Sequence, residues 1–298
     1  MRKYIAFLLA CLWSSLALAQ VAWVSPSAGV KTTASSSITF TGYGTGATTN
    51  TFTECVVYTE NAATSPNPAL ATVSSFADAG GTGSPHAWTN RQGISDNKVT
   101  TGSFQNLERW WMASAGAIST GINITATFSG AAEAAIMLCN EYTGVNLTNP
   151  YDPNVSLPRP ANIVAAAGNP TIAGISTTEA ATMVQIYTGA AEPSSACPTF
   201  SAVTIGGTGG TVGAQSNQNT AAVNFACAAF GLLAETTTKS SISASLTGSQ
   251  ADTITTADAL CATSNATCAP VASGCKRSMA MTGFGCWFIW RRRMAVIR

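Results

Sequence analysis

The feature that most constrains this chain is a period-two alternation of apolar and polar residues in short segments. It is clearest from Ile122 to Phe128 (INITATF), where every odd position in the segment is apolar and every even position is Asn or Thr. Successive side chains of a strand point to opposite faces, so this pattern predicts a half-buried strand. The Ser129-Gly130 pair that follows predicts a turn.

Other segments repeat this short, strand-like character, and Gly-rich or Pro-containing connections separate them. Short strands with such connections favour an all-β, antiparallel β-sandwich or jelly roll in one domain. A domain boundary in the Pro-rich stretch Pro150–Pro160 is the alternative. The further predicted strands are Ser37–Gly42, Thr51–Thr59, Leu107–Ala113, Ala134–Tyr142, Ala181–Tyr187, Ala221–Leu233 and Ser241–Leu246.

The low charge content supports this fold class. Only 9% of residues are charged, against roughly 25% in ordinary soluble domains. Helices usually need charged outer faces, whereas strands and loops are solvated well by Ser, Thr, Asn and Gly. With 46% hydrophobic residues and a formal net charge of +1, the chain does not have the composition of a disordered protein.

Charge is distributed unevenly along the chain. All 13 acidic residues lie between Glu54 and Asp258, whereas six of the 14 basic residues lie in the last 23 positions. From Gln20 to Cys275, six basic residues face 13 acidic ones, a net charge of −7. A nucleic-acid partner is therefore disfavoured, because the body of the chain offers no basic stripe.

The N-terminus has the order of a cleavable secretory signal. Arg2-Lys3 precedes an apolar run, and Ala17-x-Ala19 supplies small residues at the cleavage point, so residues 1–19 are predicted to be removed. An uncleaved anchor is disfavoured because the run is shorter than the roughly 20 apolar residues that span a bilayer. A lipoprotein modified at Cys11 is the other alternative. We expect an exported protein: extracellular, periplasmic or on the cell surface.

Cysteine usage agrees with an oxidising destination. Removal of the signal leaves an even number, eight, which is typical of a disulfide framework. The best local pairing is Cys261 with Cys268, which bracket a six-residue loop; the connectivity of the others stays open. A metal site is disfavoured because there is no Cys-x-x-Cys and only one histidine. The other disulfide candidates are Cys55, Cys139, Cys197 and Cys227.

A segment in the middle of the chain resembles bacterial and phage extracellular jelly-roll modules. The resemblance rests on Thr125–Gly130 (TATFSG), Ala134–Val145 (AAIMLCNEYTGV) and Asn149–Asp152 (NPYD), with an aromatic strand upstream at Glu108–Ala113. It implies a concanavalin-like sandwich on a surface protein and brings no catalytic residues. This chain departs from the pattern in its extra cysteines and its longer Gly-rich second half.

The Glu141-Tyr142-Thr143-Gly144 corner has a structural interpretation. Gly144 can adopt the positive φ of a tight turn, while Tyr142 covers the end of the sandwich and its hydroxyl finds a backbone partner. Glu141 is a candidate ligand contact, although a lone carboxylate beside a turn more often bonds local backbone N–H groups.

Few residue patterns in the sequence suggest catalysis. The single histidine, His86, lies in a loop-like stretch and is expected to be solvated, and there is no Gly-x-Ser-x-Gly motif. No cofactor and no metal are predicted. Two carboxylates suffice for glycoside hydrolysis, so a polysaccharide-active hydrolase or lyase stays an alternative. The candidates are scattered, with no pair on one strand face: Glu54, Glu60, Glu108, Glu133 and Glu141.

Sugar binding is the favoured function, because aromatic rings stack on pyranose faces. The aromatic candidates are Trp88, Trp110, Trp111 and Tyr58. Trp110 and Trp111 are adjacent, so on a strand one belongs to the core and the other to the surface or rim, unless a loop covers the second. We expect a non-catalytic glycan-binding or adhesion module, whose partner is a glycan or cell-surface polymer. A purely structural surface or appendage protein is the third hypothesis.

The C-terminal part divides into two predicted segments after the sandwich domain of residues 20–260. Residues 261–278 form a Cys-containing linker, and residues 279–298 form an apolar segment with a basic tail. Small residues, an apolar run and Arg291-Arg292-Arg293 follow the order of a bacterial sorting signal, which suggests membrane attachment. As a helix, Met279–Trp290 spans only about 18 Å of a hydrocarbon core of about 30 Å. An interfacial anchor or a non-native chain end are therefore alternatives.

Overall fold

The computed structural model describes the chain from Gln20 to Cys268. The described part has gaps at 27–28, 45–50, 63–69, 82–83, 99–102, 115–117, 119–120, 164–167, 193–196, 198, 221–223, 249–251 and 266–267. The predicted signal peptide, most of the predicted linker, Cys275, Cys286 and the apolar-basic tail lie outside the described residues.

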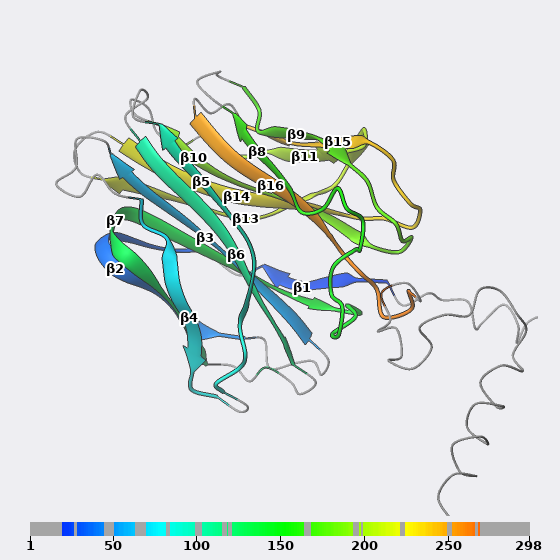
Figure 1. Ribbon diagram of the computed structural model, residues 1–298, viewed down its shortest axis with the longest axis horizontal. Helices are drawn as coiled ribbons and strands as arrows, with labels where there is room; N and C mark the ends of the chain where they lie inside the picture. Colours follow the sequence, from blue (N-terminus) through cyan, green and yellow to red (C-terminus); the bar gives the residue numbers. More distant parts are fainter. Residues whose placement is uncertain are drawn as a thin grey trace, which may run out of the picture.

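The described residues form strands and no helix, which confirms an all-β, antiparallel, sandwich-like fold (Figure 1). None of the described residues belongs to a helix whose length and apolar character would let it cross a bilayer. The strands are β1 Ala22–Pro26, β2 Val30–Tyr43, β3 Thr51–Ala62, β4 Val73–Ala79, β5 Thr89–Lys98, β6 Ser103–Ser114, β7 Ile122–Thr143, β8 Arg159–Ile163, β9 Thr171–Ile175, β10 Met183–Glu192, β11 Ala202–Ile205, β12 Thr208–Gly209, β13 Thr211–Thr220, β14 Asn224–Ala234, β15 Ile242–Thr247 and β16 Asp252–Leu260.

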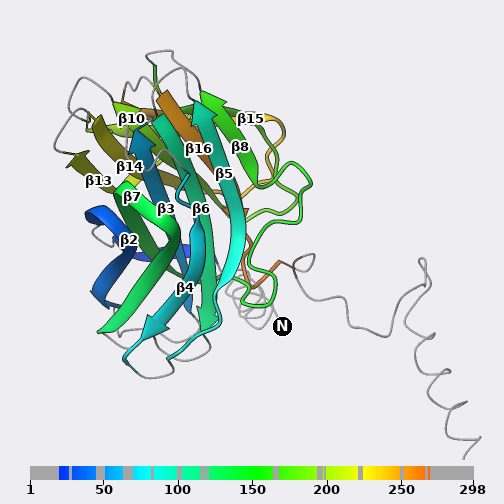
Figure 2. The same cartoon turned by 60° about the vertical axis from the view of Figure 1, so that its left-hand side comes forward.

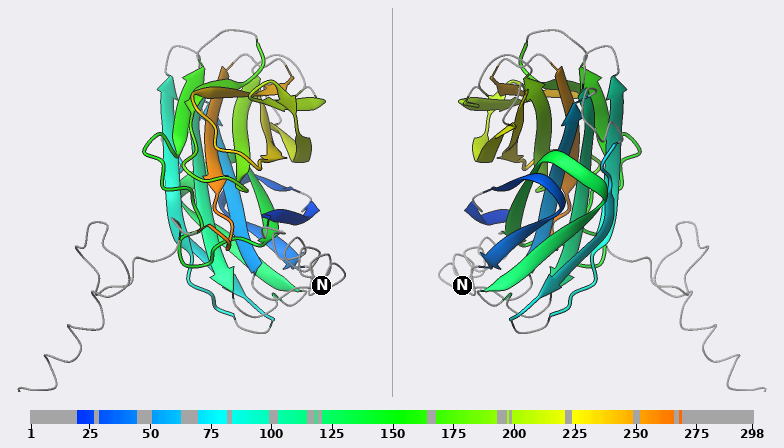
Figure 3. Two further views of the ribbon diagram at one scale, coloured as in Figure 1. Left: turned by 90° about the vertical axis from the view of Figure 1, so that its right-hand side faces the viewer. Right: turned by 90° about the vertical axis from the view of Figure 1, so that its left-hand side faces the viewer.

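The first half of the chain forms a seven-stranded sheet built on β7. Its order is β1-β7-β3-β6-β5, and β2 and β4 also pair with β7. The prediction of a turn at Ser129-Gly130 is wrong, because β7 continues through these residues as one long strand. The register against β2 shifts between Ser35 and Ser37, and β7 bends there (Figure 3). Its first half therefore covers the outer face of its own sheet and encloses a second core.

The second half of the chain forms two further sheets, which the sequence did not predict as separate layers. A five-stranded sheet, β13-β14-β10-β16-β8, packs with one face against the seven-stranded sheet. A four-stranded sheet, β12-β11-β15-β9, covers the other face of the five-stranded sheet. The middle sheet is thus buried on both sides. That explains why every residue of β16 is buried although its sequence, DTITTADAL, is largely polar.

The main core lies between the seven-stranded and five-stranded sheets. Tyr58 of β3 and Tyr187 of β10 are completely buried there. Opposite Tyr58, β10 carries Gly189, where a Cβ atom would overlap the tyrosine ring. This glycine therefore allows the close approach of the two sheets.

The connection between the two halves, residues 144–158, is fixed to the end of β16. Backbone bonds join Asn146 N–H to the Cys261 carbonyl (2.8 Å) and Asp152 N–H to the Ala259 carbonyl (2.9 Å). The positive φ predicted for Gly144 is confirmed at 72°, and a Cβ atom there would also meet the Gln20 backbone.

Within the described residues, three disulfides join strands or loops. Cys55 and Cys139 face each other in register on β3 and β7, with a Cα–Cα distance of 4.0 Å. Cys197 pairs with Cys227, and the predicted Cys261–Cys268 pair is confirmed. Such bridges fit an oxidising compartment.

Candidate functional site

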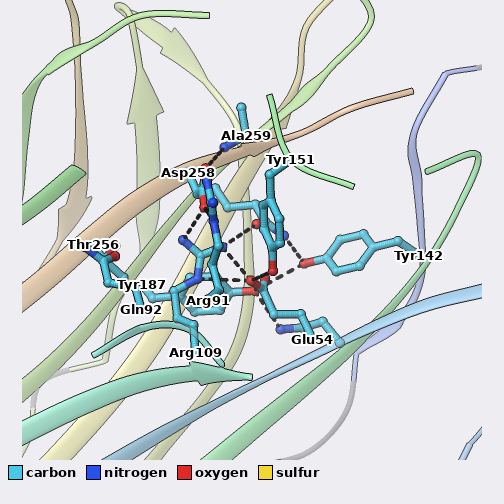
Figure 4. Close-up of polar contacts among 12 residues, drawn as sticks. Glu54, Arg91, Gln92, Arg109, Tyr142, Tyr151, Tyr187, Thr256, Asp258 and Ala259 are labelled. Carbon is cyan, nitrogen blue, oxygen red and sulfur yellow. Dashed lines mark hydrogen bonds and ion pairs between the residues drawn. The ribbon is translucent and has the colours of Figure 1, made fainter. Parts of the chain in front are cut away.

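Two concentrations of polar and aromatic side chains stand out, one inside the sandwich and one on its outer face. The inner one centres on Arg109 of β6, which is fully buried (Figure 4). Its guanidinium donates to Glu54 Oε1 (3.0 Å from Nε) and to Gln185 Oε1 (3.1 Å), and lies 3.2 Å from Asp258 Oδ2. Although burial disfavours the charge, Glu54 and Asp258 hold the pKa of Arg109 above its ordinary value.

A β-bulge brings a second cation to this network. The register of β5 against β6 shifts between Asn90 and Gln92, so Arg91 is the extra residue. Its Nε donates to Asp258 Oδ2 (2.9 Å), and its guanidinium lies 4.2 Å from the Tyr151 ring centroid. The bulge thereby re-aims Arg91 across the edge of the sandwich.

Tyrosine hydroxyls satisfy the remaining acceptors of Glu54. Tyr151 donates to Oε1 (2.9 Å) and Tyr187 to Oε2 (2.8 Å). Burial first, and the charge of Glu54 second, raise the pKa of both hydroxyls. Glu54, Arg109 and Asp258 are completely enclosed, so this network holds the two sheets together and offers no access to a polymeric ligand.

The outer concentration is an aromatic cluster on the seven-stranded sheet, formed by Phe76 of β4, Trp88 before β5 and Trp110 of β6; we call it the aromatic patch (Figure 2 shows these elements). The Phe76 ring stacks on Trp110 at a centroid distance of 5.4 Å and is tilted against Trp88 at 4.6 Å. All three residues are half-buried, and Phe76 and Trp88 also pack against the second core.

Asp78 orients the Trp88 side of the patch. It lies two residues after Phe76, on the same face of β4, and its carboxylate accepts four hydrogen bonds. The donors are Ser84 Oγ (2.6 Å), the His86 backbone N–H and ring Nδ1 (both 2.9 Å) and Trp88 Nε1 (2.8 Å). Burial would raise the pKa of Asp78, but these donors outweigh it and lower the pKa.

Glu108 orients the Trp110 side in the same way. Its Oε1 accepts from the Val73 backbone N–H (2.7 Å) and Asn106 Nδ2 (2.8 Å), and its Oε2 from Asn90 Nδ2 and Trp110 Nε1 (both 3.1 Å). Each carboxylate therefore fixes one indole ring, and all of its acceptor positions are filled.

The expectation of a solvated His86 is wrong. Its ring is held by Asp78 and its side chain is only 10% exposed. Although Ser84 and His86 both contact Asp78, the Ser84 hydroxyl donates to Asp78 and to the Gly80 carbonyl and is not bonded to the imidazole. The three residues thus lack the relay geometry of a catalytic triad.

The structure separates the sequence-predicted candidates. Trp88 and Trp110 meet in the patch, whereas Trp111 faces the inner core, where it stacks on Phe52 at 5.6 Å. Tyr58 is fully buried and its hydroxyl donates to Gln105 (3.0 Å). Neither Trp111 nor Tyr58 contributes to the patch.

Glu141 is also placed in the interior, with 1% exposure, on the face of β7 opposite to Tyr142. A surface ligand does not reach it. The Tyr142 hydroxyl finds side-chain partners rather than the expected backbone partner: it accepts from Gln185 Nε2 (2.6 Å) and lies 3.4 Å from the Tyr187 hydroxyl.

Sequence reasoning alone does not single out Phe76 or Asp78. The only local signal is their two-residue spacing in the short segment Val73–Ala79, which puts both on one face. Their pairing with Trp88 and Trp110 arises from contacts between strands that are not hydrogen-bonded neighbours.

A small cavity lies elsewhere, beside the Cys197–Cys227 disulfide. It measures about 300 Å³ and is lined by Phe200 and by polar, uncharged residues of β13 that include Gln215 and Asn217. The Gln215 side chain is bonded to the Phe200 backbone in both directions. The cavity shares no residue with the aromatic patch.

Within the part of the chain that the structure describes, no group of three or more His, Cys, Asp and Glu side chains is arranged to hold a metal ion. Comparisons with protein-family models, with curated proteins and with solved structures find no match to this chain. The function is therefore inferred from the chemistry of the site itself.

Proposed function

We propose that this chain is an exported, non-catalytic glycan-binding or adhesion protein that binds its ligand at the aromatic patch. The observation that carries the proposal is the way in which two buried carboxylates, Asp78 and Glu108, each hold one indole of a half-buried aromatic cluster. Fixed rings lose little conformational entropy on binding, and ring faces suit the apolar faces of sugars.

The hydrogen bonding of these carboxylates supports binding over hydrolysis. General acid or base catalysis needs a carboxyl group free to exchange a proton with the ligand. Asp78 and Glu108 are occupied by four donors each, and Glu54 and Asp258 are enclosed between the sheets. A hydrolase or lyase is thus the less supported alternative, and a purely structural module is a further one.

The proposed location and fold type rest on other features. The predicted signal peptide and the three disulfides support export to an oxidising compartment. The proposed jelly-roll or concanavalin-like type is supported by two packed antiparallel sheets and by the resemblance at Thr125–Asp152. Membrane or cell-wall attachment through the basic tail belongs to the same proposal.

The test is binding of the mature, oxidised protein to a glycan array and to insoluble cell-wall polysaccharides. We expect binding that falls at least about fivefold in Trp88→Ala and Trp110→Ala, the loss of roughly 1 kcal/mol or more typical of an anchoring aromatic residue. Trp111→Phe, an inner-face change, is the matched control, and circular dichroism verifies folding of each variant.

Absence of binding to every glycan, or binding that the patch variants leave unchanged, would overturn the proposal. Release of reducing ends from a polysaccharide panel, abolished by Glu108→Gln, would instead establish the hydrolase. Self-assembly of the protein without any glycan would favour the structural module.

A further inference from the structure

We infer that the aromatic patch selects glycans that carry positively charged ammonium groups, such as polymers with unacetylated amino sugars, over neutral ones. This inference rests on the proposed function and names the ligand class of the same site. Three observations carry it: the carboxylates beside the rings, the hydrogen bonding of the indoles, and the commitment of nearby donors.

Two carboxylates lie beside the patch, at the N–H edges of its two indole rings. Asp78 and Glu108 are 5% and 6% exposed, and each bonds the indole N–H of a patch tryptophan. Apart from the His86 imidazole, their partners are neutral hydroxyl, amide, indole and backbone groups, which stabilise the charge without cancelling it. Among the described residues, no Lys or Arg forms an ion pair with either carboxylate.

The hydrogen bonds also change the rings. An N–H group that donates to an anion polarises its own donor, so the π-systems of Trp88 and Trp110 gain electron density. Tryptophan has the most favourable ring face for a cation, and the attraction grows with that density. Phe76 stacks on Trp110 and covers part of one face of that ring, so a ligand meets the ring surface that stays at the solvent. The patch therefore attracts cations both through this ring surface and through the carboxylates at the indole N–H edges.

The indole N–H donors of the patch are not available to a neutral sugar. Both are committed to carboxylates, and Asn90 Nδ2 donates to Glu108. Neutral sugar-binding sites combine aromatic stacking with side chains that bind hydroxyl or acetamide oxygens, and these committed donors do not serve in that second role. An ammonium group needs no donor from the protein.

The experiment compares two oligosaccharides of equal length, N,N,N-trimethylated glucosamine oligomers and N-acetylglucosamine oligomers, by isothermal titration calorimetry at pH 7.5. The trimethylated probe carries a permanent charge and no N–H group, which isolates the attraction of the rings and carboxylates. We expect it to bind about tenfold more tightly, which corresponds to about 1.4 kcal/mol, because a cation–π contact favours the charged probe alone.

Variants and a competitor locate the effect. Trp88→Phe and Trp110→Phe keep an aromatic ring but lose the indole, and should reduce the preference for the charged oligomer at least threefold, whereas Trp111→Phe should preserve it. Tetramethylammonium chloride should compete more strongly than sodium chloride at equal ionic strength, because simple screening affects both salts alike.

The outcomes separate the inference from the proposed function. Equal or tighter binding of the acetylated oligomer overturns the inference and leaves the glycan-binding proposal intact. A preference that the patch variants do not change, or equal competition by the two salts, also overturns it. No binding of either oligomer, together with a negative glycan array, overturns both.

Discussion

Glu60 lies near the C-terminal end of β3. Its side chain points to the same face of the strand as Val56 and Tyr58, which face the five-stranded sheet. It is 2% exposed, and neither carboxyl oxygen has a hydrogen-bond partner among the described residues. Burial first, and then the negative charges of Glu133 and Asp252, raise its pKa from 4.5 to about 8. The folded protein therefore keeps Glu60 protonated at neutral pH.

The raised pKa makes folding stability depend on pH. Because the folded pKa lies above the unfolded one, the folded state binds the proton more tightly, and stability falls as pH rises from 4.5 towards 8. The slope approaches about 1.4 kcal/mol per pH unit, so the loss at pH 7.5 is at most about 4 kcal/mol. That is a large fraction of the roughly 5–15 kcal/mol of a typical domain.

We predict that Glu60→Gln stabilises the protein by about 2–4 kcal/mol at pH 7.5 and has little effect at pH 4.5, where the native carboxyl is neutral too. Urea unfolding followed by tryptophan fluorescence at pH 4.5, 6, 7.5 and 9 measures this difference. Glu179→Gln is the control, since it makes the same carboxyl-to-amide change at a half-buried position. A Glu60→Gln difference that does not grow between pH 4.5 and 7.5, or that Glu179→Gln reproduces, would refute the reasoning.

Two further substitutions test the packing of the sheets. Arg109→Met leaves Glu54 and Asp258 buried without their shared cation and should lower the free energy of unfolding in urea by about 3–5 kcal/mol. Arg91→Met, at the half-exposed edge, should lower it by less than half of that. Equal losses in the two variants would contradict a central role for Arg109. Gly189→Ala places a methyl group against the buried ring of Tyr58 and should lower the free energy of unfolding by about 1–3 kcal/mol. An unchanged denaturation midpoint would contradict a tight approach of the two sheets at this glycine.

Local periodicity predicted many of the strands. Ile122–Phe128 and Ala134–Tyr142 are both confirmed, because alternation reports which residues share a face. It did not show that the two segments form one strand. Ser129-Gly130 has the composition of a turn, and only the register against β2, far away in sequence, makes it a bend within β7.

Strands in which apolar and polar residues do not alternate were not predicted from the sequence. Thr89–Lys98 (β5) is polar apart from Gly93 and Ile94, and Asp252–Leu260 (β16) is buried on both faces, so neither shows the pattern of a half-buried strand. Some of their polar groups pair between sheets: Thr256 Oγ1 donates to Gln92 Oε1 at 2.6 Å. Such a partner, 164 residues away, leaves no mark in a local window.

The sequence by itself determined what depends on neighbouring residues. It predicted strand propensity, the opposite directions of Trp110 and Trp111, the positive φ of Gly144 and the Cys261–Cys268 pair, because each follows from geometry within a few positions. It also carries the predicted export signal and the low charge that favours strands and loops over helices.

Only the tertiary structure decided which tryptophan faces outward and which carboxylates hold the patch. Asp78 and Trp88 are ten residues apart, and Glu108 and Val73 are 35 apart, on strands whose relative positions depend on the bend of β7 and the pairing of β4 with it. The layers that enclose Arg109 join residues of both halves of the chain. Long-range pairing is set by the total burial of apolar and polar groups, which a local pattern does not contain.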